Sequence, residues 1–167
     1  IPENGRPVEI AALKSGDYTF LSSQTNILML ADKKKSLLYL LKPELNDPIL
    51  LETRATYAVW SPSFKKLMIS DDFELRLYDY EKNEINFVTR HGEPIKKALW
   101  LDSENHLVIE FGNSILGAEL DFRDNNYSPT LASGKDISDL FLADKTKTAY
   151  FTAETAEGRR LFKLPIQ

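Results

Sequence analysis

The side chains best suited to acid–base or metal chemistry in this sequence are its two histidines, His91 and His106. Imidazole titrates near neutral pH and is a common metal ligand. His91 follows Arg90 in a short polar segment, whereas His106 stands directly before an apolar run. Metal centres and general acid–base sites need several converging ligands or titratable groups. We therefore interpret both histidines as turn residues and expect no catalytic residue, metal site or cofactor.

Other reactive patterns are missing or incomplete. The chain has no cysteine, which excludes thiol nucleophiles, cysteine-bound zinc and disulfide bonds. The segment D-F-R-D-N-N at 121–126 offers several oxygen ligands, but it lacks the spacing of a calcium-binding loop. No serine stands in a G-x-S-x-G context. We expect no enzymatic activity, and the alternative is a hydrolase or lactonase that acts on a small molecule or sugar.

Four aromatic residues end short apolar runs at nearly constant spacing. The residues are Phe20, Trp60, Trp100 and Phe141, and the intervals are 40, 40 and 41 residues. The two tryptophans could form a platform on which a ligand stacks. Their identical place in each interval instead favours structural anchors that pack between repeats, because large aromatic side chains bury much apolar area.

Each interval continues with further apolar runs of about three to six residues, separated by polar turns. The second runs lie at 27–30, 67–69, 107–109 and 149–151, the third at 37–41, 75–80, 115–120 and 161–164, and the fourth at 49–53, 85–89 and 127–131. Four short strands in a repeat of about 40 residues are typical of β-propeller blades. The runs are too short for helical repeats. The sequence therefore predicts an all-β fold of four blades, each with antiparallel strands.

We place the blades at 14–54, 55–94, 95–135 and 136–167, within a single domain over 1–167. The last blade lacks a fourth run, and the run at 8–13 is expected to complete it as a strand, with a short helix as the alternative. Such pairing closes a ring and removes an exposed sheet edge. A closed ring of four blades, an eight-blade homodimer and an excerpt of a longer propeller remain open.

Several motifs resemble those of TolB-like, WD-repeat-like bacterial propellers. The run W-S-P-S-F-K-K-L at 60–67 is similar to their W-S-P-D-G-K-x-L motif, with Ser63 and Phe64 in place of the Asp-Gly pair. This replacement affects the tight turn rather than the blade. The runs S-D-D-F-E-L-R-L-Y-D at 70–79 and V-T-R at 88–90 continue the resemblance.

Residues 94–167 resemble more particularly the C-terminal propeller of bacterial PEGA-domain proteins. The resemblance is carried by P-I-K-K-A-L-W at 94–100, G-N-S-I at 112–115, E-L-D-F-R-D at 119–124 and L-F-K-L at 161–164. It implies a membrane anchor and a PEGA domain upstream of Ile1, an extracytoplasmic location and no catalytic activity. The polar start of the sequence agrees with a chain cut from something longer.

The charge of the chain narrows the partners. Lys and Arg number 21 against 25 Asp and Glu, which gives a net charge of −4, so nucleic acid is not expected as a partner. No apolar window is long enough to insert into a membrane. We expect a binding or scaffolding module for a protein, peptide or envelope glycan, with a self-associating module as an alternative.

Arg90 and His91 precede a first strand and are the candidates for a channel rim, while His106 falls on the opposite rim.

Overall fold

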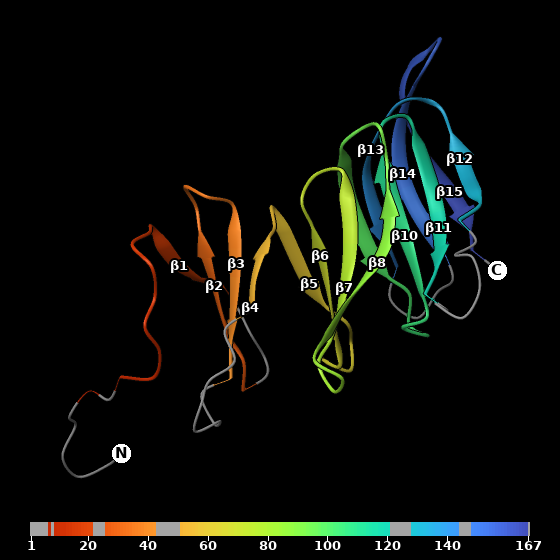
Figure 1. Cartoon of the computed structure of the whole chain (residues 1–167). Helices are drawn as coiled ribbons and strands as arrows, with labels where there is room; N and C mark the ends of the chain where they lie inside the picture. The colour runs from red at the N-terminus through yellow and green to blue at the C-terminus, as the bar shows by residue number, and fades with distance from the viewer. Residues whose placement is uncertain are drawn as a thin grey trace. The chain divides into compact units, whose positions relative to one another are not determined.

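Figure 1 shows the computed structural model of the chain. It describes residues 7, 9–21, 26–42, 51–120, 128–143 and 148–166. Every regular element in these ranges is a strand, which confirms the all-β prediction. The described residues contain no helix that is long and apolar enough to cross a membrane. The chain divides into two compact units, 1–56 and 57–167.

The first unit holds one antiparallel sheet of four strands, which we call sheet 1. Its strands are β1 (Tyr18–Leu21), β2 (Leu28–Asp32), β3 (Leu37–Leu41) and β4 (Leu51–Arg54), in that spatial order. Leu30, Tyr39 and Leu41 form its buried apolar cluster. Tyr18 packs edge-on against Tyr39, with ring centroids 5.4 Å apart.

Asp32, at the end of β2, organises the turn into β3. Its side chain is fully buried and accepts hydrogen bonds from the backbone N–H groups of Lys34 (3.0 Å) and Asp17 (3.4 Å). Burial raises the pKa of this carboxyl, but those hydrogen bonds and the charge of Lys35 outweigh it and hold the pKa below its ordinary value. Acidic turn residues thus stabilise this corner of the sheet.

The second unit contains three further antiparallel sheets, each with its strands in sequence order (Figure 1). Sheet 2 has β5 (Tyr57–Trp60), β6 (Lys66–Ser70), β7 (Glu74–Asp79) and β8 (Glu84–Arg90). Sheet 3 has β9 (Ile95–Trp100), β10 (His106–Phe111), β11 (Ser114–Glu119) and β12 (Thr130–Ser133). Sheet 4 has β13 (Lys135–Leu142), β14 (Thr148–Thr155) and β15 (Gly158–Pro165). Most of these strands overlap the predicted runs, but β12 begins three residues later than the run predicted at 127–131. The first residues of that run and of the run at 49–53 lie outside the described residues.

Sheet 3 is buried on both of its faces. Leu107 and Ile109 of β10 pack into an apolar cluster with Met68 and Leu77 of sheet 2. Val108, between them in the sequence, packs into a second cluster that contains residues of sheet 4. Successive residues of a strand point to opposite faces, so a strand covered on both faces is apolar throughout. The continuous apolar runs in the sequence therefore have this physical cause.

The N-terminal segment corrects the strand expected at 8–13. Residues 9–13 belong to no strand and no helix, and Val8 lies outside the described residues. Ala11 packs against the apolar cluster of sheet 1. Within the described part of the chain, sheet 4 consequently has three strands.

The turn at 61–66 keeps its tight form although Ser63 and Phe64 replace the Asp-Gly pair of the motif. Phe64 takes a left-handed conformation with φ of 59°, which glycine adopts most readily. Its N–H donates to the carbonyl of Ser61 at 2.9 Å. Glu104, forty positions later, has φ of 53° and makes the equivalent bond to Leu101, also at 2.9 Å. The turn geometry thus repeats even where the glycine does not.

Candidate ligand-binding site

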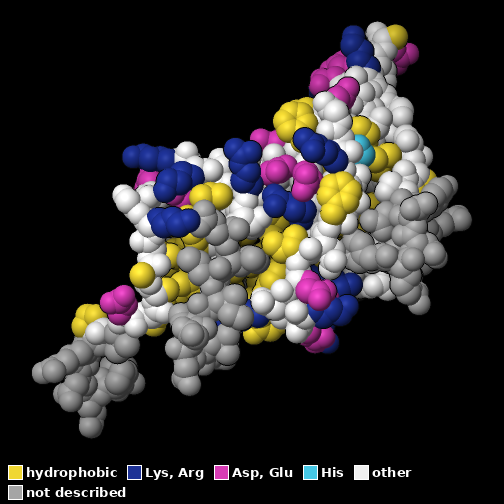
Figure 2. Space-filling model, in the orientation of Figure 1, with side chains coloured by type: hydrophobic (Ala, Val, Ile, Leu, Met, Phe, Trp, Pro, Cys, Tyr) yellow, Lys and Arg dark blue, Asp and Glu magenta, His cyan; other side chains and the backbone are white. Residues whose placement is uncertain are grey.

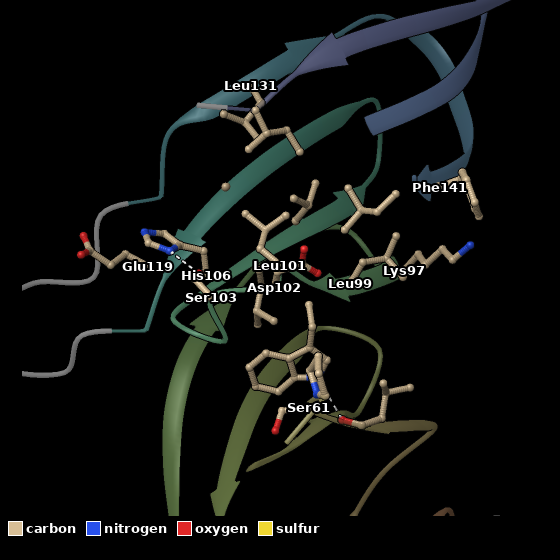
Figure 3. A pocket seen from close by; sticks show the side chains of 18 of the residues that line it. Ser61, Lys97, Leu99, Leu101, Asp102, Ser103, His106, Glu119, Leu131 and Phe141 are labelled. Carbon is tan, nitrogen blue, oxygen red and sulfur yellow. Dashed lines mark hydrogen bonds between the residues drawn. The ribbon is translucent and has the colours of Figure 1, made fainter. Parts of the chain in front are cut away.

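A pocket of about 900 Å³ lies within the second unit (Figure 3). Its walls come from the ends of the first strands β5, β9 and β13, from the turns that follow β5 and β9, and from residues of β10, β11 and β12. Trp60, Trp100 and Phe141 all line it. Its size falls in the range of small-molecule and peptide side-chain sites, roughly 300–1,000 Å³. Three of the four repeat anchors therefore meet at one cavity.

The first strands are joined to one another by hydrogen bonds between side chains and backbone. The bonded residues are about one repeat apart, so equivalent positions of neighbouring sheets come together. The bonds run from Trp100 Nε1 to the Val59 carbonyl (3.2 Å), from the Tyr57 hydroxyl to the Ala98 carbonyl (3.4 Å) and from Lys97 Nζ to the Leu140 carbonyl (2.7 Å). This alignment places the three anchors at the same level of their sheets.

The turns that form one side of the pocket are linked directly. The Glu104 carboxylate accepts hydrogen bonds from the hydroxyl of Ser63 (2.5 Å) and from its backbone N–H. Lys66 Nζ donates to the Glu104 carbonyl at 3.4 Å. The left-handed conformation of Glu104 belongs to this arrangement. The wall of the pocket is therefore held in place before any ligand arrives, which lowers the ordering cost of binding.

Burial of the four anchors differs from the expectation of a packed core. Phe20 is 72% exposed and Phe141 is 58% exposed, whereas Trp60 and Trp100 are half-buried. The first strand is an edge of each sheet, so its side chains meet fewer neighbours than those of the middle strands. The fully buried apolar residues lie on the middle strands, as Leu67 and Leu107 do. The packing predicted for the two tryptophans does not extend to the equivalent phenylalanines, which are mostly exposed.

The polar groups of the pocket come from turn and strand-end residues. Asp102 and Glu119 line it, and neither side chain makes a hydrogen bond or ion pair with a described residue. The His106 Nδ1 atom lies 3.2 Å from the Ser103 hydroxyl, as Figure 3 shows. The sequence predicts a turn position for His106 and carries no motif signal for the two carboxylates. Their shared signal is position, because all of them lie near the pocket ends of β9, β10 and β11.

The two tryptophans differ in the fate of their indole N–H groups. Trp100 donates to Val59, whereas the Nε1 atom of Trp60 is buried and has no acceptor among the described residues. We expect Trp100→Phe to lower the free energy of unfolding by about 1 kcal/mol more than Trp60→Phe does. Both changes remove similar volume, so each serves as the other's control. Urea denaturation followed by far-ultraviolet circular dichroism measures the difference, and a larger loss for Trp60→Phe would contradict this assignment.

The channel-rim candidates Arg90 and His91 lie away from the pocket. His91 connects β8 to β9, at the start of β9, whereas the pocket lies at the end of that strand. Its ring stacks on Phe111, with centroids 4.1 Å apart and planes 20° apart. Burial lowers the pKa of this histidine, which favours its neutral form. Arg90 is exposed at the end of β8. The structure brings neither residue to the candidate site.

The described ranges contain no cluster of side chains that could bind a metal ion. No group of three or more His, Asp or Glu side chains there is placed to hold an ion. The acidic segment at 121–126 lies outside the described residues. On the face that Figure 2 shows, basic and acidic side chains stand beside one another rather than in separate patches. The pocket is therefore the feature with the clearest capacity to bind.

Comparison with protein-family models and with curated proteins finds no match for this chain. The resemblance to TolB-like propellers and to the propeller of PEGA-domain proteins stays a hypothesis based on short motifs.

Proposed function

We propose that this chain is a set of β-propeller blades that acts as a non-catalytic binding module and holds a peptide segment of a partner protein in the pocket. The observation that carries the proposal is the cavity of about 900 Å³ lined by Trp60, Trp100 and Phe141. Apolar and aromatic walls with a few polar groups are typical of binding sites. Aromatic side chains also dominate the energy of protein interfaces.

The propeller arrangement is supported by the way the sheets of the second unit succeed one another. Each sheet runs in the order of its strands, and bonds about one repeat apart join the first strands. In a propeller the first strand of every blade lies nearest the axis, so the pocket would open at one mouth of the channel. An extracytoplasmic, membrane-tethered location, drawn from the sequence, is a further part of this hypothesis, and a self-associating module is the alternative to it.

The second candidate function is hydrolysis, which the contact between Ser103 and His106 favours. A serine nucleophile needs a base that is itself oriented by a third group. Here both side chains are exposed and three positions apart in one turn. No described carboxylate bonds to the histidine. The arrangement matches a polar turn more closely than an activated nucleophile, so we favour binding.

The proposal is tested by replacing an exposed aromatic wall residue. Peptides selected from a displayed library on the purified chain are expected to bind Phe141→Ala about tenfold more weakly than the wild type, because an interface aromatic is lost. Phe87→Ala is the matched control, since Phe87 is 55% exposed and lies on β8, outside the pocket. Calorimetry measures the affinities.

Two outcomes would overturn the proposal. Equal affinity of the selected peptides for the wild type and for Phe141→Ala would show that the peptides bind outside the pocket. Turnover of p-nitrophenyl acetate by the wild type, lost in Ser103→Ala, would establish the hydrolase alternative.

A further inference from the structure

We infer that the pocket selects a basic residue of its peptide partner, an arginine or lysine side chain held between the aromatic wall and the Asp102 carboxylate. The inference rests on the proposed function and names the chemistry of its ligand. Three features carry it: the charges left without partners, the aromatic rings beside them, and the cost of covering a carboxylate with a neutral group.

The charged side chains of the pocket differ in whether they have hydrogen-bond partners among the described residues. Asp102 and Glu119 have no hydrogen-bond or ion-pair partner among the described residues, and Lys97 Nζ donates to the carbonyl of Leu140 at 2.7 Å. Figure 3 shows Asp102 among the apolar side chains near the middle of the lining, and Glu119 at its margin, beyond His106. Two carboxylates of the lining thus have no partner within the described ranges, and its lysine is bonded to the β13 backbone.

The aromatic rings add a second attraction for a cation. Trp60, Trp100 and Phe141 line the same cavity as Asp102, and Phe141 keeps 58% of its surface exposed. A guanidinium or ammonium group is attracted to the face of an aromatic ring, most strongly to that of tryptophan. The methylene groups of Arg and Lys also cover apolar surface while the charge meets the carboxylate. A basic side chain therefore satisfies both kinds of wall.

A neutral apolar ligand fits the pocket less well. Filling the cavity with such a group would remove water from the Asp102 carboxylate without supplying a hydrogen-bond donor. Covering a charge without a partner is costly. The net charge of −4 on the chain acts in the same direction, since it attracts cationic segments at low salt. Charge complementarity therefore favours a basic peptide over a neutral or an acidic one.

The test compares two capped pentapeptides, Leu-Phe-Arg-Phe-Leu and the same peptide with citrulline, which has the shape of arginine but no charge. We expect the arginine peptide to bind about tenfold more tightly by calorimetry at low salt. This preference is expected to fall to about twofold or less in Asp102→Asn, since charge attraction depends on that carboxylate. Asp72→Asn is the matched control, because Asp72 is also exposed but lies in the turn at the opposite end of sheet 2.

The outcomes separate this inference from the proposed function. Equal affinity for the two peptides, with both weakened by Phe141→Ala, overturns the selection of a basic residue but supports a pocket that binds peptides. A preference for arginine that survives in the double variant Asp102→Asn, Glu119→Gln also overturns the inference. Binding of neither pentapeptide overturns it as well, and the library-selected peptides then decide the proposed function alone.

Discussion

Replacing Leu107 by alanine is expected to lower the free energy of unfolding of the second unit by about 2–5 kcal/mol. Leu107 is fully buried on β10 and packs with Met68 and Leu77 of sheet 2. Truncating it removes apolar contacts and leaves a cavity between two sheets that are fixed by their other contacts. Urea denaturation followed by the fluorescence of the tryptophans measures the loss.

Phe141→Ala is the control for Leu107→Ala. Phe141 is an anchor of the sequence repeat, but it is 58% exposed, so its loss is expected to cost less than about 1 kcal/mol. If Phe141→Ala destabilised the chain as much as Leu107→Ala, the aromatic positions would be core anchors after all, and the pocket would not be open at that residue.

Replacing Glu110 by alanine is expected to destabilise the second unit by about 1–3 kcal/mol. Glu110 of β10 is 2% exposed, and its carboxylate accepts a hydrogen bond from the backbone N–H of Leu140 at 3.2 Å. Alanine would leave that buried N–H without a partner. Glu110→Gln keeps an acceptor at the same place. Its free energy of unfolding at pH 7 is expected to be at least as large as that of the wild type.

The pH dependence of stability follows from the same carboxyl. Burial raises the pKa of Glu110, against the lowering effects of the Leu140 N–H and of Lys96 and Lys97. The folded state therefore binds a proton more readily than the unfolded state does. The stability contributed by this group increases as the pH falls through the folded pKa, and it is lost as the pH rises. Denaturation midpoints between pH 4 and 7 should show this slope reduced in Glu110→Gln, and an unchanged slope would contradict the role of Glu110.

The middle strands of sheet 3 could be predicted because both faces of this sheet are covered. Leu107 and Val108 face different neighbours, yet both are buried. Residues on both faces of such a strand are therefore apolar, and the sequence shows a continuous apolar run about every forty residues. The second and third strands of each repeat can therefore be recognised from apolar runs and turn residues alone.

The pocket was not predicted, because its position depends on how neighbouring repeats align. Trp60 and Trp100 occupy equivalent positions in the repeat, and this regularity indicates that both residues pack between repeats. Neither position by itself indicates that the two residues line one cavity. Asp102 and Glu119 belong to different strand ends and have no motif in common. Only the stacking of the sheets brings these residues together.

Irregularities in β13 also escaped the sequence pattern. Asp136 and Asp139 have φ of 51° and 60°, and the pairing of β13 with β14 shifts register beside Ser138. These bulges let the backbone of Leu140 bond to Glu110 and Lys97 of sheet 3. Apolar periodicity reports which residues are buried, but it does not report where a strand departs from its ladder.

The most direct test of binding in the pocket uses the only two tryptophans of the chain, Trp60 and Trp100, both of which line it. Their indole N–H groups give two separate signals in a proton–nitrogen correlation spectrum. Adding a peptide selected on the chain is expected to shift both signals in proportion to the bound fraction, and Phe141→Ala should move this response to about tenfold higher peptide concentration. Peptide binding that shifts backbone signals while both indole signals stay in place would contradict a ligand site in this pocket.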